Sequence, residues 1–207
     1  MKEQKKRRTN GEKSTERIAN AEERKSDKMK TLLVMDMVKE YIYGEKPLIP
    51  IENREKLISN VKRVINLAHE KNMPVIYVNS AFTKNDSILK IIGHRLQAMK
   101  GTEGAQIIPE LKPIKKDYVV EKRGYDGFWK SNLEKTLKKL KVNDIYLTGQ
   151  QTDCCIRETG VTAAHLGYKV FVIEDCCDTS RELGQEAAIR FMKTCVGNII
   201  KSNNLEW

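Results

Sequence analysis

The segment Leu147–Ile156 places a cysteine at the start of a predicted helix; it reads Leu-Thr-Gly-Gln-Gln-Thr-Asp-Cys-Cys-Ile. Residues 144–147 predict a buried strand and residues 156–166 an amphipathic helix, so Cys155 falls in the first helical turn. Unpaired N–H groups and the positive end of the helix dipole favour a thiolate there and can hold a developing oxyanion. The alternative for a single cysteine is a small, inert core residue.

Two other predicted strands also end on side chains that can do chemistry. Residues 30–36 form a strongly apolar run that ends at Asp36, and residues 118–122 form a shorter one that ends at Lys122. Taken singly, the carboxylate could cap its strand and the lysine could be solvated. Ligands bind beyond the carboxyl ends of strands in an open parallel sheet, so Asp36, Lys122 and Cys155 are expected to meet in one site.

The chain alternates between predicted strands and helices. Residues 52–70 carry apolar side chains at helical spacing, and residues 75–78 follow as a strand. This alternation predicts an α/β fold with three α/β/α layers, a mostly parallel, Rossmann-like open sheet and right-handed crossovers. The long connection from Ser80 to Pro113 is expected to cover a substrate.

Five segments recur in the order found in one enzyme family: Val34–Met37, Met99–Gly104, Val120–Phe128, Thr148–Ile156 and Leu166–Asp175. On these segments the chain resembles the isochorismatase-like cysteine hydrolases, which include nicotinamidases, N-carbamoylsarcosine amidases and isochorismatases. The resemblance covers residues 30 to 200 or so. The segments are weak signals one by one and specific together.

The resemblance implies that Asp36, Lys122 and Cys155 are a catalytic triad. Cys155, and not Cys154, is the implied nucleophile, because the family's Thr-Asp-x-Cys pattern matches residues 152–155. In chemical terms, Cys155 would attack an amide-type carbonyl and Asp36 would take the thiol proton and return it to the leaving amine. Lys122 would stabilise the thiolate, and water would hydrolyse the thioester.

The same resemblance implies a cis peptide bond between Gln150 and Gln151, just before the cysteine turn. The backbone N–H groups of Gln151 and Cys155 are the expected oxyanion donors.

Three aromatic residues are the expected walls of the substrate pocket. Tyr41 follows Asp36 by five residues, and Tyr125 and Phe128 follow Lys122. The family has an aromatic residue at the position of Tyr41, whereas Phe128 could equally be a core residue. We expect a small, flat, mostly apolar carbonyl compound to bind between Tyr41 and the loop bearing the other two.

The sequence predicts neither a metal nor another cofactor. Nicotinamidase-type relatives carry Asp-x-His after the second strand and another histidine before the Met-Lys-Gly segment. Residues 78–82 and 96–99 contain no histidine, and His94 is offset from the family position. This puts nicotinamide in doubt as a substrate. The adjacent pairs Cys154-Cys155 and Cys176-Cys177 lack the spacing of a metal cluster.

Length and charge complete the expectations. The 207 residues suffice for one hydrolase domain, which we place at residues 29–207, after a basic appendage at residues 1–28 that is expected to be flexible. The chain lacks a membrane-spanning run and a signal core, and its five cysteines do not suggest a disulfide framework, so a cytoplasmic location is expected.

The net charge of +10 comes from dispersed lysines, without the aromatic–basic pattern of a nucleic-acid platform. No nucleic-acid or membrane partner is expected. The expected partners are a small-molecule substrate and, as in the family, further copies of the chain in a homo-oligomer.

The leading hypothesis is a cysteine hydrolase that cleaves a small amide, ureide or carbamoyl C–N bond. One alternative is isochorismatase-type hydrolysis of a vinyl ether with Asp36 as the acid, against which the presence of Cys155 argues. A third hypothesis, different in kind, is a basic protein that binds nucleic acid through residues 1–28.

Overall fold

The computed structural model describes residues 28–93, 97–181, 184–205 and 207. Nearly all of the expected basic appendage, residues 1–28, therefore lies outside the described residues, as does His94. The appendage and the domain boundary that follows it remain expectations from the sequence.

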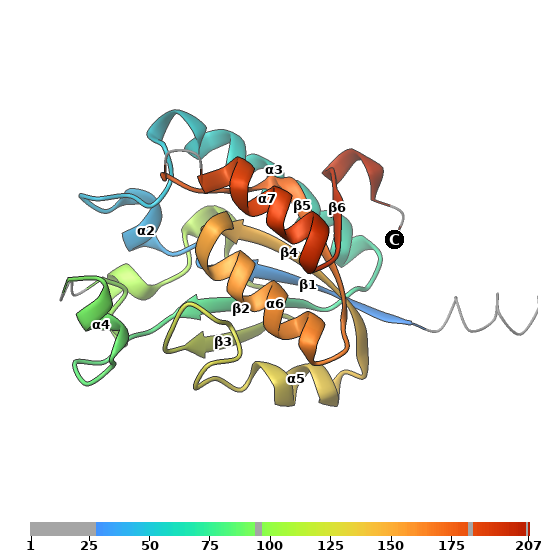
Figure 1. Ribbon diagram of the computed structural model, residues 1–207, viewed down its shortest axis with the longest axis horizontal. Coiled ribbons are helices and arrows are strands. Elements are labelled where there is room, and N and C mark those ends of the chain that lie inside the picture. Colours follow the sequence, from blue (N-terminus) through green and yellow to red (C-terminus); the bar gives the residue numbers. More distant parts are fainter. Residues whose placement is uncertain (1–27, 94–96, 182–183, 206) are drawn as a thin grey trace, which may run out of the picture.

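A six-stranded parallel sheet forms the centre of the molecule, with the strand order β3-β2-β1-β4-β5-β6 (Figure 1). The strands are β1 (Met29–Met35), β2 (Val75–Ser80), β3 (Tyr118–Lys122), β4 (Val142–Gln150), β5 (Lys169–Asp178) and β6 (Asn198–Ile200). The predicted α/β fold is confirmed, and the sheet is parallel throughout. The strand order is the Rossmann order, in which the chain runs outward in both directions from the centre.

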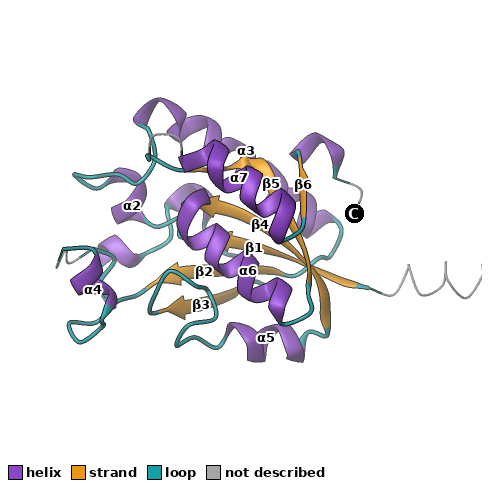
Figure 2. Ribbon diagram, viewed as in Figure 1, coloured by secondary structure: helices purple, strands orange, loops and turns teal. Residues whose placement is uncertain are grey.

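Helices cover both faces of the sheet (Figure 2). The α-helices are α2 (Lys39–Tyr43), α3 (Arg54–Glu70), α4 (Ile88–Ile91), α5 (Leu133–Lys139), α6 (Arg157–His165) and α7 (Gly184–Cys195). Shorter helical turns span Ile51–Asn53, Glu103–Ala105, Pro109–Leu111 and Ser202–Asn204. Strands and helices thus build the three layers that their alternation in the sequence predicts.

Alternating side chains of β1 divide the core in two. Leu32 and Val34 pack toward α3, whose own buried face repeats at the predicted helical spacing. Leu33 and Met35 point to the opposite face and pack with α5, α6 and α7. A strand buried on both faces must be apolar throughout, which explains the continuous hydrophobic run that leads to Asp36.

The direction of the connections reverses between β1 and β4. These neighbouring strands pair from Lys30 with Asp144 to Met35 with Gly149, and the chain leaves them toward opposite edges of the sheet. Such a switch point opens a crevice beyond the carboxyl ends of the strands. The residue after β1 is Asp36, so the fold brings this carboxylate to the crevice.

The turn after β4 differs from the expected start of an α-helix. Residues Thr152–Ile156 form a π-helical turn, and α6 begins only at Arg157. The carbonyl of Gln151 accepts hydrogen bonds from the N–H groups of Cys154 and Ile156. Cys155 therefore lies in a widened turn before α6, and such π-helical turns are frequent at functional sites.

No helix in the described part of the chain is long and apolar enough to cross a bilayer.

Gly149 is required where β4 passes β1, because its φ is +105° and an added Cβ would lie 2.1 Å from the carbonyl oxygen of Met35. We expect Gly149→Ala to lower the free energy of unfolding by more than about 2 kcal/mol. Gly167→Ala is the control, since Gly167 also has a positive φ, +87°, but open space around it. Equal losses for the two variants in urea denaturation would show that the contact with Met35 is unimportant.

Candidate active site

The structure brings together the three side chains that the sequence singled out. Lys122 Nζ lies 2.8 Å from Asp36 Oδ2 and 3.4 Å from Cys155 Sγ. The side chains of Lys122 and Asp36 are 0% and 1% exposed, so the lysine is not a solvated surface residue. A buried ammonium thus contacts a carboxylate and a thiol that come from the ends of different strands.

Lys122 has two further partners, which satisfy its ammonium group. Its Nζ donates to Ser80 Oγ at 3.0 Å and to the carbonyl of Gly124 at 2.8 Å. Burial alone would lower the pKa of Lys122, but the charge of Asp36 and the hydrogen bond with it oppose burial, and the pKa is raised. Lys122 is therefore a permanent cation within the site.

Asp36 is fixed by its backbone and by one of its carboxylate oxygens. Its φ of +52° is a left-handed conformation that Asp tolerates better than most residues. The backbone N–H of Ser80 donates to Asp36 Oδ1 at 2.6 Å, and Gln150 Nε2 donates to the Asp36 carbonyl at 2.8 Å. Oδ2 forms the ion pair with Lys122 at 2.8 Å and accepts from no other described group. This oxygen therefore retains a lone pair that can accept a proton.

Cys155 is a buried thiol that needs a base. Its hydrogen bond with the sulfur of Cys154 raises its pKa, and burial raises the pKa further, while Lys122 opposes both effects. The neutral thiol is therefore the resting form, whereas the pattern at a helix start alone favoured a thiolate. A proton acceptor beside it, such as Asp36, would generate the nucleophile on demand.

The backbone before the cysteine has the cis peptide that the family resemblance implied, between Gln150 and Gln151. The side chain of Gln151 is held by a hydrogen bond from its Nε2 to the carbonyl of Leu48 at 3.0 Å. Both Gln151 and Cys155 line the same cavity. Their N–H groups are the candidates for binding an oxyanion.

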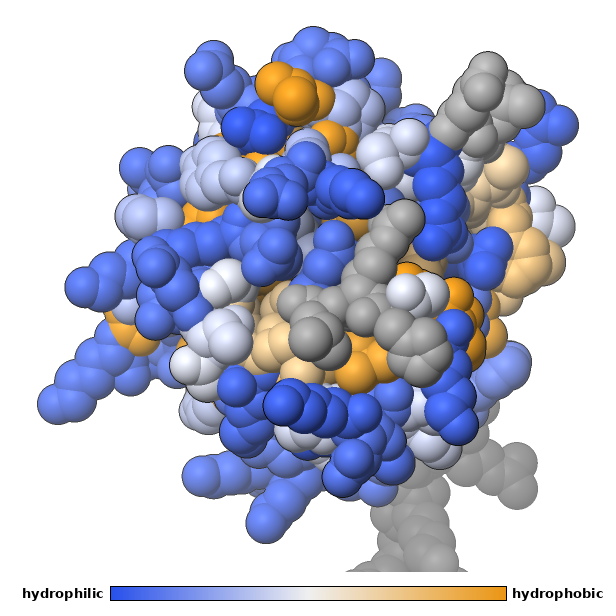
Figure 3. Space-filling view, turned by 90° about the vertical axis from the view of Figure 1, so that its left-hand side faces the viewer, coloured by the Kyte–Doolittle hydropathy of each residue, from blue (hydrophilic) through white to orange (hydrophobic). Residues whose placement is uncertain are grey.

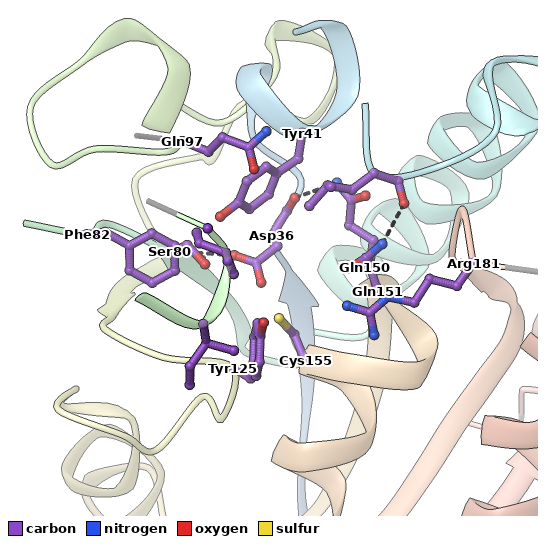
Figure 4. Close-up of a pocket in the computed structure, with 14 residues that line it drawn as sticks. Asp36, Tyr41, Ser80, Phe82, Gln97, Tyr125, Gln150, Gln151, Cys155 and Arg181 are labelled. Carbon is purple, nitrogen blue, oxygen red and sulfur yellow. Dashed lines mark hydrogen bonds between the residues drawn. The ribbon is translucent and has the colours of Figure 1, made fainter. Parts of the chain in front are cut away.

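A cavity of about 510 Å³ opens over these residues. Its lining comprises Asp36, Tyr41, Leu48, Ser80, Phe82, Ile91, Ile92, Gly93, Gln97, Tyr125, Gln150, Gln151, Cys155 and Arg181. Figure 3 faces the side of the molecule at which the strand ends lie, where apolar side chains interrupt a largely hydrophilic surface. Figure 4 shows the Cys155 sulfur and the Asp36 carboxylate turned toward the cavity.

The structure places two of the three expected wall residues at the cavity. Tyr41 and Tyr125 contribute to its lining. Phe128 is not among the lining residues and stacks on Tyr168 in the core, with ring centroids 6.4 Å apart. The expected covering segment contributes Ile91, in α4, and neighbouring residues of the loop after β2.

Among the polar lining residues that were not identified from the sequence, three lie at or shortly after strand ends: Ser80, Gln150 and Arg181. Ser80 and Gln150 are the last residues of β2 and β4, and Arg181 follows the end of β5. The strand-end argument that selected Asp36 and Lys122 could have found them. Serine, glutamine and arginine are common on protein surfaces, so their residue types gave no further indication of a role in the site.

The last residues of β2 do not fit the metal of nicotinamidase-type enzymes. Asn79 and Ser80 are buried there and supply an amide and a hydroxyl in place of imidazole. The Ser80 hydroxyl already accepts from Lys122. Across the described ranges, no group of three or more His, Cys, Asp or Glu side chains could hold a metal ion.

Comparisons with known proteins identify one family. The model of the isochorismatase domain matches residues 30–204. Ureidoacrylate amidohydrolase RutB of Variovorax paradoxus is 27% identical over 193 residues, which cover 80% of this chain and 75% of RutB.

Solved structures are also similar. N-carbamoylsarcosine amidase from Thermoplasma acidophilum superposes with a TM-score of 0.78 at 29% identity, covering 86% of this chain and 99% of that one. An isochorismatase-like hydrolase from Alkaliphilus metalliredigens gives 0.77 at 26% identity, covering 84% and 95%. The resemblance seen in the sequence is confirmed: the chain belongs to the isochorismatase family of hydrolases.

Proposed function

We propose that this protein is a cysteine hydrolase that cleaves a C–N bond of a small amide, ureide or carbamoyl compound. The observation that carries the proposal is the contact of one buried ammonium, that of Lys122, with both Asp36 and Cys155 at the floor of the cavity. Two similar proteins, RutB and the N-carbamoylsarcosine amidase, are named as amidohydrolase and amidase, which supports the same class of reaction.

In the first half of the reaction, the thiol of Cys155 attacks the substrate carbonyl. The S–C bond forms while the thiol proton moves to Asp36 Oδ2, the oxygen that has Lys122 as its one described partner. The N–H groups of Gln151 and Cys155 stabilise the oxyanion. The tetrahedral intermediate then collapses: the C–N bond breaks, and the leaving nitrogen takes the proton from Asp36.

In the second half, water hydrolyses the thioester. The water oxygen bonds to the carbonyl carbon while Asp36 accepts a proton from the water. The C–S bond then breaks, and the proton returns to Cys155. Lys122 remains protonated throughout and offsets the negative charge on the sulfur and the carboxylate, consistent with its raised pKa.

A covalent route explains the thiol better than the vinyl ether alternative does. Hydrolysis of a vinyl ether with Asp36 as the acid needs no nucleophilic sulfur. Cys155 nevertheless lines the cavity and contacts Lys122. We therefore favour C–N bond cleavage.

The first test uses the adjacent cysteines as a matched pair. We expect Cys155→Ala to abolish ammonia release from a panel of small amides, ureides and carbamoyl compounds. Cys154→Ala should keep most of the activity, because it is the sulfur of Cys155 that accepts from Lys122. Activity that survives in the Cys155 variant, or equal losses in both variants, would refute the covalent mechanism.

The second test separates catalysis from stability at the ion pair. Asp36→Asn should lower turnover by about 10²- to 10⁴-fold, because it removes the general acid–base group. Lys122→Met leaves a buried carboxylate unpaired and should lower the free energy of unfolding by about 3–5 kcal/mol. The double variant Asp36→Asn/Lys122→Met should be more stable than Lys122→Met alone, because it no longer contains an unpaired buried carboxylate. Urea denaturation measures this, and a double variant that is no more stable would contradict a buried, charged pair.

The third test concerns metal dependence. Since Asn79 and Ser80 offer no imidazole at the family's metal position, activity should persist after treatment with EDTA and dialysis. Recovery of lost activity on addition of zinc, iron or manganese would show that the region after β2 has been misinterpreted. Metal content of the dialysed enzyme, measured by elemental analysis, provides the control.

A further inference from the structure

The hydroxyl of Tyr41 reaches the catalytic centre from outside the sheet. Tyr41 lies on the short helix α2 and is 5% exposed. Its ring packs with Val38 and Ala98, and its carbonyl accepts a hydrogen bond from the N–H of Leu48 at 2.9 Å. Figure 4 shows the side chain extending from α2 into the cavity, toward Ser80 and Asp36. A wall built only from hydrophobic surface would not need this hydroxyl.

The phenol keeps its proton in this position. Burial raises the pKa of Tyr41, and the nearby Asp36 carboxylate raises it further. A neutral phenol can accept one hydrogen bond and donate another. Tyr41 therefore brings a neutral hydrogen-bond donor to a cavity that is also lined by the Asp36 carboxylate and the Cys155 thiol.

Ser80 connects this phenol to the catalytic lysine. Lys122 Nζ can only donate, so Ser80 Oγ accepts from it at 3.0 Å. Figure 4 shows the Tyr41 side chain directed toward Ser80, and the Ser80 hydroxyl lowers the pKa of Tyr41 against the larger effect of burial. Ser80 has one proton to donate while it accepts from Lys122, and its effect on the pKa of Tyr41 is a lowering, the direction expected when it donates to Tyr41 Oη. The proton of Tyr41 is then directed away from Ser80 and into the cavity.

We propose that the Tyr41 hydroxyl, positioned by Ser80, selects substrates that carry a second hydrogen-bond acceptor close to the scissile carbonyl. This inference rests on the proposed function, in which the N–H groups of Gln151 and Cys155 bind the carbonyl oxygen. Tyr41 therefore needs a different acceptor, such as a ring nitrogen or another carbonyl or carboxylate oxygen. A substrate without one would leave the buried hydroxyl unpaired and would bind less well.

Aldehydes test this inference whatever the natural substrate is. The thiol of Cys155 adds across an aldehyde C=O: the S–C bond forms and the thiol proton ends on the oxygen, giving a reversible thiohemiacetal. Benzaldehyde and its three pyridinecarbaldehyde analogues have nearly the same shape and differ by one acceptor nitrogen at three positions. Isothermal titration calorimetry gives the Kd of each aldehyde for wild type and for Tyr41→Phe.

The informative quantity is, for each aldehyde, the Kd of Tyr41→Phe divided by the Kd of wild type. The intrinsic reactivity of the aldehyde cancels in this ratio. We expect a ratio near one for benzaldehyde and about tenfold for at least one pyridine isomer, the size of one hydrogen bond. Ratios near one for all four compounds would overturn the inference. An equal increase for all four, benzaldehyde included, would also overturn it, because the hydroxyl would then support the site in general.

Two further variants complete the test. Tyr43→Phe is the matched control, since Tyr43 lies on the same helix but donates outside the cavity, to Glu110 Oε1 at 2.8 Å; its ratios should all be near one. Ser80→Ala should reduce the preference for the pyridine isomer, and adding Tyr41→Phe to it should reduce that preference little more. Independent, additive losses would refute the positioning role of Ser80.

A failure of the proposed function would be detected with a different variant, Cys155→Ala. Cys155→Ala should lose binding of all four aldehydes equally. If this variant bound them as wild type does, the nucleophile would be wrong. The comparison of wild type with Tyr41→Phe would still decide whether the hydroxyl recognises an acceptor.

Discussion

The site depends on a buried ion pair between Asp36 and Lys122. Removing two charges from water costs several kcal/mol for each, and their attraction offsets this only when the remaining polar atoms also find partners. Here the Ser80 N–H, the Ser80 hydroxyl and the Gly124 carbonyl supply those partners. Both groups also need strands that end at the same edge of the sheet, since β2 lies between β1 and β3. The parallel sheet meets this requirement, and the loop after β3 adds the Gly124 carbonyl that accepts from Lys122.

Much of the fold, and the meeting of Asp36, Lys122 and Cys155, could be predicted because each followed from a pattern along the chain. Apolar runs gave the strands, their alternation with helices gave the parallel sheet, and strand ends gave Asp36 and Lys122. The carboxyl ends of parallel strands share one edge, so their convergence did not depend on the details of side-chain positions. The motif with Cys155 then selected one of two adjacent thiols as the candidate nucleophile.

The parts that could not be predicted depend on how loops direct side chains. The π-helical turn before α6 departs from the helix start that periodicity indicated, because periodicity does not distinguish one turn type from another. Phe128 follows Lys122 closely in sequence, yet the loop turns its ring toward Tyr168. Ser80 contacts both charged residues, but a serine at a strand end is too common to be noticed.

The position of β3 at the edge of the sheet has a consequence for how the site responds to local motion. Lys122 is the last residue of β3, and this strand pairs with β2 alone. Edge strands detach at lower free energy than central ones, which are held on both sides. Brief release of β3 would withdraw the ammonium from Asp36 and Cys155 while the central strands stay paired. The candidate site would thus lose its organisation before the molecule as a whole unfolds.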